Sequence, residues 1–181
     1  MDTLYFITGN DDKFREVKEL LPEIQRLDID LPEVQSLDPE VVIREKLNAA
    51  RDQRSGSFIV EDTSLYLDGL NGFPGPLIKW LMQAVGNQGI YELTSRIMDY
   101  GAIAKTMIGY SDADGNVTYF ESSLIGKIVA PVSEPGQGFG WDEIFQPDGT
   151  SESFAEMGNE LKAEFSMRSD AVKKLKQFLA K

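Results

Sequence analysis

Two amino acids are missing from this chain, and their absence excludes much of enzyme chemistry. The 181 residues contain no cysteine and no histidine. Without cysteine there is no disulfide, no thiolate nucleophile and no Cys-ligated metal. Without histidine there is no Ser-His-Asp triad and no His-ligated zinc site. Acid-base groups must therefore be carboxylates, lysines or tyrosines, and any metal must be a hard cation held by oxygen, such as magnesium, manganese or calcium.

The sequence also lacks long apolar runs and an excess of positive charge. No run approaches the ~20 apolar residues of a membrane span, and the start, Met1-Asp2-Thr3, lacks the basic region of a signal peptide. We therefore expect a cytoplasmic protein without a membrane partner. The net charge of -12 repels phosphate backbones, so we expect no nucleic-acid partner. A local basic pocket could still bind one small anion.

The apolar pattern predicts one α/β domain over residues 1–181. The first half reads as two strand–helix–strand steps, with a short strand near Ile29 and Leu31. The second half reads as two helices separated by Gly86, then antiparallel strands over about residues 102–130 that form a second lobe or extend the sheet. The expected helices cover residues 11–21, 39–51, 76–85, 88–99 and 170–180, and the expected strands cover 4–7, 57–60, 102–110, 117–121, 124–130 and 144–145.

The segment Thr8-Gly9-Asn10-Asp11-Asp12-Lys13 connects the first strand to the first helix. Backbone N–H groups at a helix start suit a phosphate, and Thr8, Asn10 and Lys13 add donors and a positive charge. The segment is not a P-loop, which needs Gly-Lys-Ser/Thr at that point. The alternative is that Gly-Asn serves the turn alone.

Three further groups are candidates for chemistry. Glu61-Asp62, at the expected end of a strand, can hold a metal and position a water, or Asp62 can simply cap the next segment. Phe139-Gly140-Trp141-Asp142 can stack on a flat base and hydrogen-bond to it, although Trp141 and Phe145 can equally be core residues. Lys162 with Ser166-Met167-Arg168 forms a polar cluster, or a helix cap beside a surface charge.

Taken in order, these segments resemble the inosine triphosphate pyrophosphatase family over residues 4 to about 179. Six motifs in the same order make a chance match improbable. The matching motifs are Thr8-Gly9-Asn10-Asp11-Asp12-Lys13, Leu31-Pro32-Glu33, Glu61-Asp62-Thr63-Ser64, Gly72-Phe73-Pro74-Gly75, Gly138-Phe139-Gly140-Trp141-Asp142-Glu143-Ile144-Phe145-Gln146-Pro147 and Phe154-Ala155-Glu156-Met157.

The resemblance implies a two-lobed α/β fold, with a long mixed sheet flanked by helices and a central substrate cleft, and a homodimer. It implies an enzyme that hydrolyses inosine, deoxyinosine and xanthosine triphosphates to the monophosphate and pyrophosphate. It also implies magnesium as cofactor, with manganese possible. Such an enzyme keeps deaminated purines out of DNA and RNA.

Carried over residue by residue, the resemblance implies roles for each matched position. Glu33, Asp62 and Glu61 would bind the metal, and Asp62, Glu61 and Lys13 would form the catalytic group. Asp62 would orient or deprotonate the attacking water. The implied substrate-binding residues are Thr8, Gly9, Asn10, Lys13, Lys46 and Thr63 on the phosphate side, and Phe139, Gly140, Trp141, Asp142, Lys162, Ser166, Met167 and Arg168 on the base side.

Met167 departs from the family pattern, which has histidine between the serine and the arginine. Methionine offers no comparable donor, so base preference is the part of the function that this position leaves open. Two other readings remain. One is a pyrophosphatase of the septum-formation-inhibitor type that acts on pyrimidine or other modified nucleotides. The other is a nucleotide-binding module that has lost catalysis.

Overall fold

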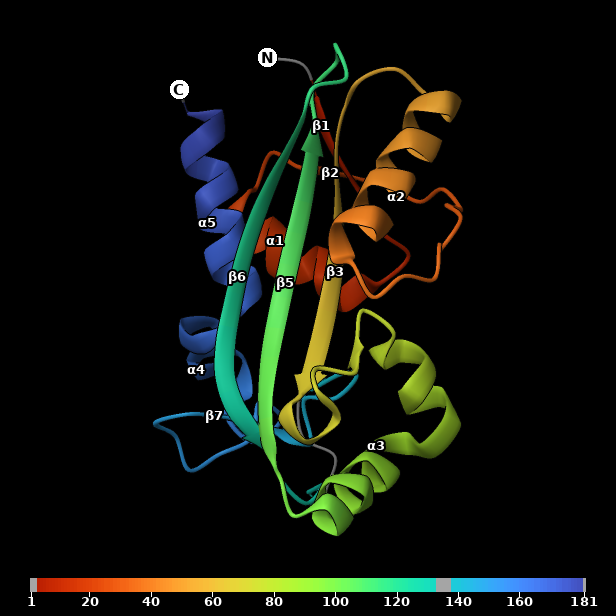
Figure 1. Ribbon diagram of the computed structural model, residues 1–181. Helices are drawn as coiled ribbons and strands as arrows, with labels where there is room; N and C mark the ends of the chain where they lie inside the picture. Colours follow the sequence, from red (N-terminus) through yellow and green to blue (C-terminus); the bar gives the residue numbers. More distant parts are fainter. Residues whose placement is uncertain (1–2, 133–137, 181) are drawn as a thin grey trace. The chain divides into compact units, whose positions relative to one another are not determined.

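The computed structural model describes residues 3–132 and 138–180, and within them seven strands form one sheet (Figure 1). The strands are β1 (Leu4–Ile7), β2 (Gln25–Leu27), β3 (Ser57–Leu67), β4 (Pro74–Gly75), β5 (Gly101–Ser111), β6 (Val117–Ile128) and β7 (Phe145–Pro147). The helices are α1 (Asp11–Leu20), α2 (Pro39–Gln53), α3 (Ile78–Ile97), α4 (Gly158–Phe165) and α5 (Met167–Leu179), with a 3-10 turn η1 (Asp68–Leu70).

The sheet is mixed, with the strand order β2-β1-β3-β5-β6-β7 and β4 paired to β3. β1 runs parallel to β2 and β3, whereas β4 and β7 pair antiparallel with β3 and β6. This confirms the predicted α/β class with a mixed sheet flanked by helices. No helix in the described part of the chain is long and apolar enough to cross a membrane.

The chain divides into two compact units, each built from separate stretches of sequence. The first unit comprises Met1–Thr63, Thr106–Ser122 and Arg168–Lys181, and the second comprises Ser64–Lys105 and Ser123–Met167. The three long strands β3, β5 and β6 each contribute residues to both units.

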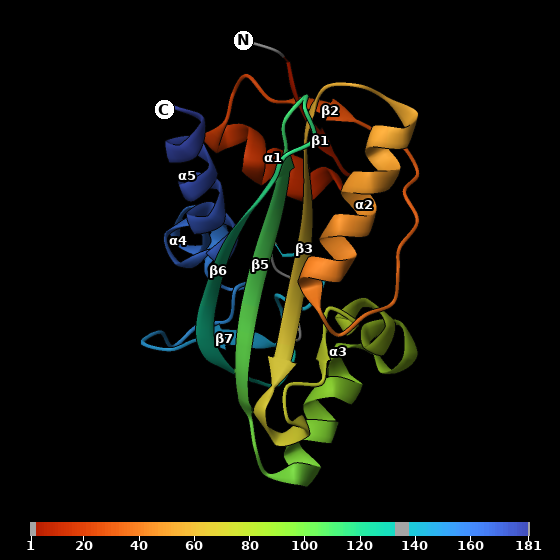
Figure 2. The ribbon, with the colours of Figure 1, turned by 45° about the horizontal axis from the view of Figure 1, so that its top comes forward.

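In the first unit, helices cover both faces of the sheet: α2 lies on one face, and α1 and α5 lie on the other (Figures 1 and 2). Successive side chains of a strand point to opposite faces, so each strand supplies both cores. Phe6, Ile59 and Ile108 pack with Val17 of α1 and the apolar side of α5. Ile7, Phe58, Val60 and Met107 pack with Ile43, Leu47 and Ala50 of α2.

The first two helices begin where the sequence predicts, because a side chain caps the start of each. Asn10 caps α1, because its side chain accepts a hydrogen bond from the Lys13 N–H. Asp38 caps α2 in the same way, and Pro39 occupies the first turn, where a missing N–H costs nothing. α2 packs closely on β5 at Gly109. A Cβ at this position would overlap the Ile43 side chain, so the glycine is what allows the close approach.

The second unit has its own core beneath α3. Leu65, Ala102, Ile128 and further apolar residues from the strands, α3 and the segment after β7 form one buried cluster. α3 is interrupted at Gly86, whose φ of 68° and ψ of 176° are not helical. The predicted division into two helices at Gly86 is therefore confirmed, although the first helical residue is Ile78 rather than Pro76.

The predicted strand at Ile29 and Leu31 is wrong. The strand that pairs with β1 is β2, four residues earlier, in the register Tyr5 with Gln25 to Ile7 with Leu27. β1 ends at Ile7, so the chain beyond Leu27 has no strand beside it. Ile29 and Leu31 instead lie partly buried against the core under α2.

Other boundaries also differ from prediction. β3 does not end at Val60 but continues to Leu67, and β6 is one strand where two were expected. α5 begins at Met167 instead of Asp170, and the prediction missed α4 completely. α4 has a largely polar sequence, which carries little apolar periodicity to reveal a helix.

Candidate active site

The turn between β1 and α1 is shaped by its own side chains. The Thr8 hydroxyl accepts from the Asn10 N–H at 3.1 Å, and Asn10 Oδ1 accepts from the Lys13 N–H at 2.9 Å. Both bonds use acceptor atoms, so each side chain keeps a donor that can meet a phosphate oxygen. Gly9 is exposed and a Cβ there would meet nothing, so space alone does not require glycine.

Arg26 fixes this turn from β2 and was not found by the sequence analysis. Its Nε donates to the Thr8 carbonyl at 3.0 Å, and its guanidinium also pairs with Asp11 at the start of α1. The arginine therefore connects both ends of the turn. A single arginine outside the expected strand carried no signal, because its partners are brought to it only by the parallel pairing of β1 and β2.

The acidic pair lies within β3 rather than at its end, and strand alternation directs the two carboxylates to opposite faces. Glu61 faces α1 and α5: its Oε1 lies 3.1 Å from Lys13 Nζ and accepts from the Thr63 hydroxyl at 2.5 Å. Lys13 Nζ also lies 3.2 Å from the Thr63 hydroxyl. Lys13, Glu61 and Thr63 thus form one group, although Lys13 and Thr63 are 50 residues apart in the chain.

Arg168, at the start of α5, holds Glu61 with two hydrogen bonds. Its Nε donates to Oε2 at 2.8 Å and its Nη2 to Oε1 at 3.0 Å, and it also contacts Thr63 and Glu16. Burial alone would raise the pKa of Glu61, but the charges of Arg168 and Lys13 outweigh it and hold that pKa well below its usual range. Burial would lower the pKa of Arg168, yet Glu61 and Glu16 raise it.

Asp62 faces the other side of β3, toward Lys46 of α2. Burial lowers the pKa of Lys46 below its ordinary value, while the charge of Asp62 opposes that shift. Lys13 lowers the same pKa, and Glu33 and Glu61 raise it, so all four groups lie close enough for their charges to act on Lys46. We call Lys13, Glu33, Lys46, Glu61 and Asp62 the charged cluster.

The charged cluster is not a cage of carboxylates. Among the described residues, no three acidic side chains gather closely enough to hold a metal ion by themselves. Glu61, which the sequence analysis named as a metal ligand, has both oxygens bonded to Arg168 and its neighbours. Glu33 and Asp62 therefore remain the better candidates, as expected where magnesium takes one or two carboxylates and completes its shell with water and phosphate.

In the second unit, three of the predicted base-side residues, Phe139, Asp142 and Lys162, form one group. Asp142 Oδ2 accepts from Lys162 Nζ at 2.7 Å and from the Phe139 N–H at 2.9 Å, and both charged side chains are buried. Lys162 Nζ also lies 4.5 Å from the centre of the Phe139 ring. A Cβ at Gly138 would lie 2.8 Å from Asp142 Cβ, so this close approach requires glycine.

Other base-side candidates lie in the apolar core of the second unit. Trp141 is only 6% exposed and packs edge-on against Phe145, with ring centres 5.5 Å apart. This burial supports the alternative that Trp141 is a core residue. Met167 belongs to the same buried cluster, and Ser166 is also buried. Phe139 is partly exposed, so it is the ring of this segment better placed to meet a base.

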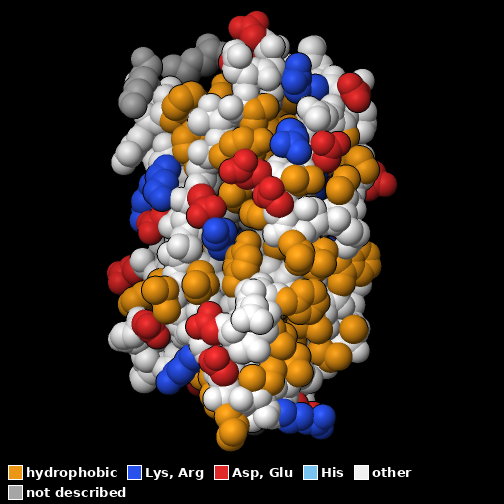
Figure 3. Space-filling model, viewed as in Figure 1, with side chains coloured by type: hydrophobic (Ala, Val, Ile, Leu, Met, Phe, Trp, Pro, Cys, Tyr) orange, Lys and Arg blue, Asp and Glu red, His pale blue; other side chains and the backbone are white. Residues whose placement is uncertain are grey.

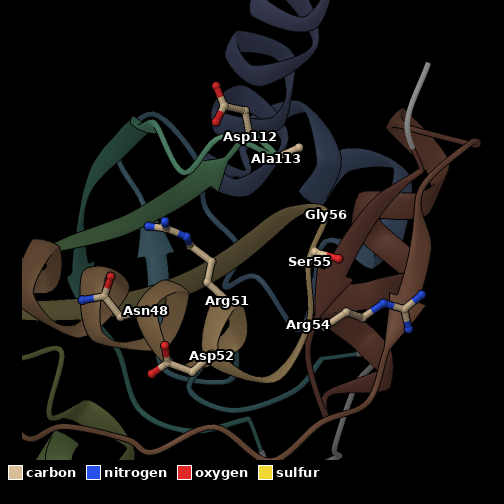
Figure 4. Close-up of a pocket in the computed structure, with 8 residues that line it drawn as sticks. All are labelled: Asn48, Arg51, Asp52, Arg54, Ser55, Gly56, Asp112 and Ala113. Carbon is tan, nitrogen blue, oxygen red and sulfur yellow. The ribbon is translucent and has the colours of Figure 1, made fainter.

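Two hollows in the first unit lie away from the charged cluster. One, of about 540 Å³, is lined by residues at the carboxyl end of α2 and in the β5–β6 turn, and Figure 4 shows Arg51 reaching toward that turn. Arg51 donates to the Gly115 carbonyl and Arg54 to the Tyr5 hydroxyl. The other, of about 860 Å³, lies between the ends of α1 and α5. Neither contains a residue that the motifs single out.

These features define a class: an α/β protein with one cluster suited to phosphates and, in its other unit, a group suited to a flat ring. The chain belongs to the Ham1 family, whose model matches residues 4–178. It is 39% identical to the inosine triphosphate pyrophosphatase of Schizosaccharomyces pombe over 99% of this chain and 96% of that protein. It is 37% identical to the inosine triphosphate pyrophosphatase of Batrachochytrium dendrobatidis over 98% of this chain and 94% of that one.

Solved structures show the same fold. A HAM1 protein from Coxiella burnetii has a TM-score of 0.83 at 23% identity, with 99% of both chains covered. The dITP/XTP pyrophosphatase of Mycobacterium abscessus has a TM-score of 0.69 at 22% identity, with 98% of this chain and 97% of that chain covered. At these identities the likeness supports the fold and not a substrate.

Proposed function

We propose that this protein is a nucleoside triphosphate pyrophosphatase that hydrolyses inosine, deoxyinosine and xanthosine triphosphates to the monophosphate and pyrophosphate. The observation that carries the proposal is the charged cluster, which gathers two lysines and three carboxylates from α1, the segment after β2, α2 and β3. Relatives at 37 to 39% identity that are named inosine triphosphate pyrophosphatase support the substrate class. A cytoplasmic enzyme of this kind would remove deaminated purines from the nucleotide pool.

Hydrolysis of a phosphoanhydride needs positioning and charge neutralisation more than a covalent nucleophile. The turn of Thr8 and Asn10 would bind phosphate oxygens through N–H and side-chain donors, and Lys13 and Lys46 would neutralise their charge. Asp62 would orient a water and accept its proton, which a carboxylate can do without histidine. Glu61, kept ionised by Arg168, would hold Lys13 in place.

Glu33 and Asp62 would hold a magnesium ion, because carboxylate oxygens are the ligands that it prefers. The charges of both residues act on Lys46. Magnesium bound there would neutralise phosphate charge and lower the pKa of a bound water, and manganese has the same ligand preference. The two lysines beside these carboxylates limit the negative charge of the site before a substrate binds.

Base selection would depend on the second unit. Phe139 would stack on the purine, and the Lys162–Asp142 pair would present a donor and an acceptor to its edge. Hypoxanthine and xanthine carry a 6-keto acceptor where adenine carries an amino donor, so a lysine donor favours keto bases. Arg168 and Ser166 remain proposed base contacts, although Arg168 is bonded to Glu61 here.

A pyrophosphate-release assay with magnesium tests this function on ITP, dITP, XTP, GTP, ATP, CTP, UTP and dTTP, with Asp62→Asn as the inactive control. Rapid release from ITP and XTP, slow release from the others and an inactive control would support it. Preference for pyrimidine nucleotides would favour the septum-formation-inhibitor type of enzyme. Binding of ITP without release would favour a non-catalytic module and overturn the proposal.

We also propose that the protein is a homodimer, as the resemblance implies. Large apolar side chains are exposed on the second unit, among them Trp80, Val85 and Met98 at 46%, 47% and 84%. Figure 3 shows apolar side chains gathered over the region that α3 occupies in Figure 1. Apolar patches that remain exposed on one copy are typical of surfaces that bind another protein.

A further inference from the structure

The break in α3 lies next to the segment that carries the base-side residues. Gly86 has a φ of 68° and a ψ of 176°, which a residue with a side chain rarely adopts, and the helix resumes directly after it. The two halves of α3 both approach Gly140 of the second unit. Met82, before the break, lies 3.9 Å from the position of a Cβ on Gly140, and Asn87, after the break, is hydrogen-bonded to it.

The Asn87 side chain makes two bonds to this segment. Its Nδ2 donates to the Gly140 carbonyl at 3.0 Å and to Glu143 Oε2 at 3.2 Å. Both partners are acceptors, so the amide nitrogen and not the amide oxygen must face them. Asn87 therefore connects α3 to both ends of the short stretch 140–143.

The other atom of the amide has no such partner. Asn87 Oδ1 is buried and has no hydrogen-bond partner within the described residues. A buried acceptor without a partner is unfavourable. The side chain therefore keeps its two donor bonds to the stretch 140–143 while its oxygen is left unsatisfied.

Gly140 is the residue of this segment that most needs such a restraint. It is exposed and has a φ of 66°, so neither packing nor a side chain limits its backbone. On one side of it, Phe139 is held by the bond from its N–H to Asp142. On the other side, Asp142 is held by Lys162. The Gly140 carbonyl is held by Asn87.

We propose that Asn87 is a positioning residue for base recognition, which fixes the backbone between Phe139 and Asp142 so that ring and carboxylate meet a purine in one arrangement. The proposal rests on the proposed function, because it assumes that these two residues contact the base. It assigns a role to a position that none of the motifs includes. The role requires an amide donor at position 87, because Asn87 Nδ2 faces the Gly140 carbonyl and the Glu143 carboxylate.

The first test is steady-state hydrolysis of ITP by the full chain. Asn87→Ala is expected to raise KM about three- to tenfold, as for the loss of one or two hydrogen bonds, with kcat within about twofold because the charged cluster is untouched. Gln88→Ala is the matched control, since Gln88 bonds to Glu92 on its own helix and should leave both constants unchanged. An unchanged KM in Asn87→Ala, or a loss confined to kcat, would overturn the proposal.

Asn87→Asp separates positioning from mere packing, because it keeps the shape and replaces the donor by a carboxylate. At neutral pH that carboxylate faces Glu143 and the Gly140 carbonyl, so KM should exceed that of Asn87→Ala. A KM of Asn87→Asp that does not exceed that of Asn87→Ala would contradict the assigned contact.

Hydrogen exchange makes the result independent of turnover. Asn87→Ala should speed exchange in a peptide covering residues 138–146, and Gln88→Ala should not. If wild type hydrolyses no nucleotide, the proposed function fails, and Asn87 is then judged as a restraint by exchange alone. Exchange that is equal in wild type and Asn87→Ala would overturn the restraint, whatever the activity.

Discussion

Arg168 illustrates how the role of one residue depends on distant partners. Its guanidinium is only 3% exposed and bonds to Glu61 and Glu16, which lie 107 and 152 residues away in the chain. The sequence predicts an arginine that reads a base edge, as the resemblance implies. The contacts assign it first to the charged residues in the middle of β3, where it keeps Glu61 ionised and therefore keeps Lys13 in position.

Glu61→Gln should destabilise the protein by about 3 kcal/mol at neutral pH, because it leaves the buried Arg168 without its main counter-charge. Urea unfolding measures this as a lower midpoint. Adding Arg168→Met to Glu61→Gln should recover part of the loss, since no buried charge then remains at that position. Arg15→Gln is the control, because Arg15 pairs with Asp12 on the exposed side of α1 and should cost well under 1 kcal/mol. Equal midpoints for wild type and Glu61→Gln would contradict the assigned pair.

The same pair predicts a pH dependence of stability. The folded-state pKa of Glu61 lies below its usual range, because Arg168 and Lys13 favour the ionised form. The stabilisation is therefore fully present above the unfolded pKa of about 4.3 and is lost as pH falls through the folded pKa. The difference in unfolding free energy between wild type and Glu61→Gln should stay constant from about pH 7 to 5 and shrink below about pH 4. A difference that is the same at pH 7 and in strong acid would show that the charge of Glu61 contributes nothing.

The site residues that the sequence could reveal are those in contiguous motifs. Asn10 and Lys13 are found because a turn and a helix start depend on neighbours within a few residues. Arg26 and Asn87 are missed because their partners are fixed only by strand pairing and by the break in α3. Trp141 remains ambiguous in sequence, since an aromatic side chain suits a base and a core equally well.

At the scale of elements, the strand–turn–helix of β1 and α1 was predicted to within one residue, whereas β3 was predicted too short and β6 was predicted as two strands. Short-range signals, such as the cap at Asn10, mark the start of α1. The length of β3 depends instead on which strands lie beside it. It pairs with β1 near its start and with β4 near its end, so the polar Glu61-Asp62 in its middle interrupts the apolar pattern and not the strand.

β2 carries Arg26 to the turn after β1, where the proposed phosphate-binding residues lie. Arg26→Ala should leave the Thr8 carbonyl and Asp11 without their shared donor and loosen the turn. We expect KM for ITP to rise about three- to tenfold, with a smaller change in kcat. Arg54→Ala is the matched control, because Arg54 contacts Tyr5 of the same β1 strand but not the turn. Equal effects of the two variants on KM would show that Arg26 acts through general stability alone.

At the scale of the whole molecule, the net charge of -12 and the exposed apolar side chains act in opposite directions on self-association. Two copies repel each other through their acidic surfaces, so a dimer needs a contact that is largely apolar. The face of α3 offers one: Trp80 is 46% exposed, and the neighbouring Lys79 ammonium lies 5.5 Å from its ring. A positive charge beside the apolar side chains reduces the repulsion between two copies at that face.

Light scattering coupled to size exclusion should therefore give about twice the chain mass of 20.2 kDa. Trp80→Asp should shift the protein toward the monomer, because a contact between copies would then bury an added negative charge. Ile125→Asp is the control. Ile125 lies on β6 of the same unit and is 62% exposed, so this substitution adds the same negative charge outside the face of α3. A monomeric wild type would refute the dimer. A dimer that survives Trp80→Asp but dissociates with Ile125→Asp would place the interface on β6, because only the contact that buries the new charge is weakened.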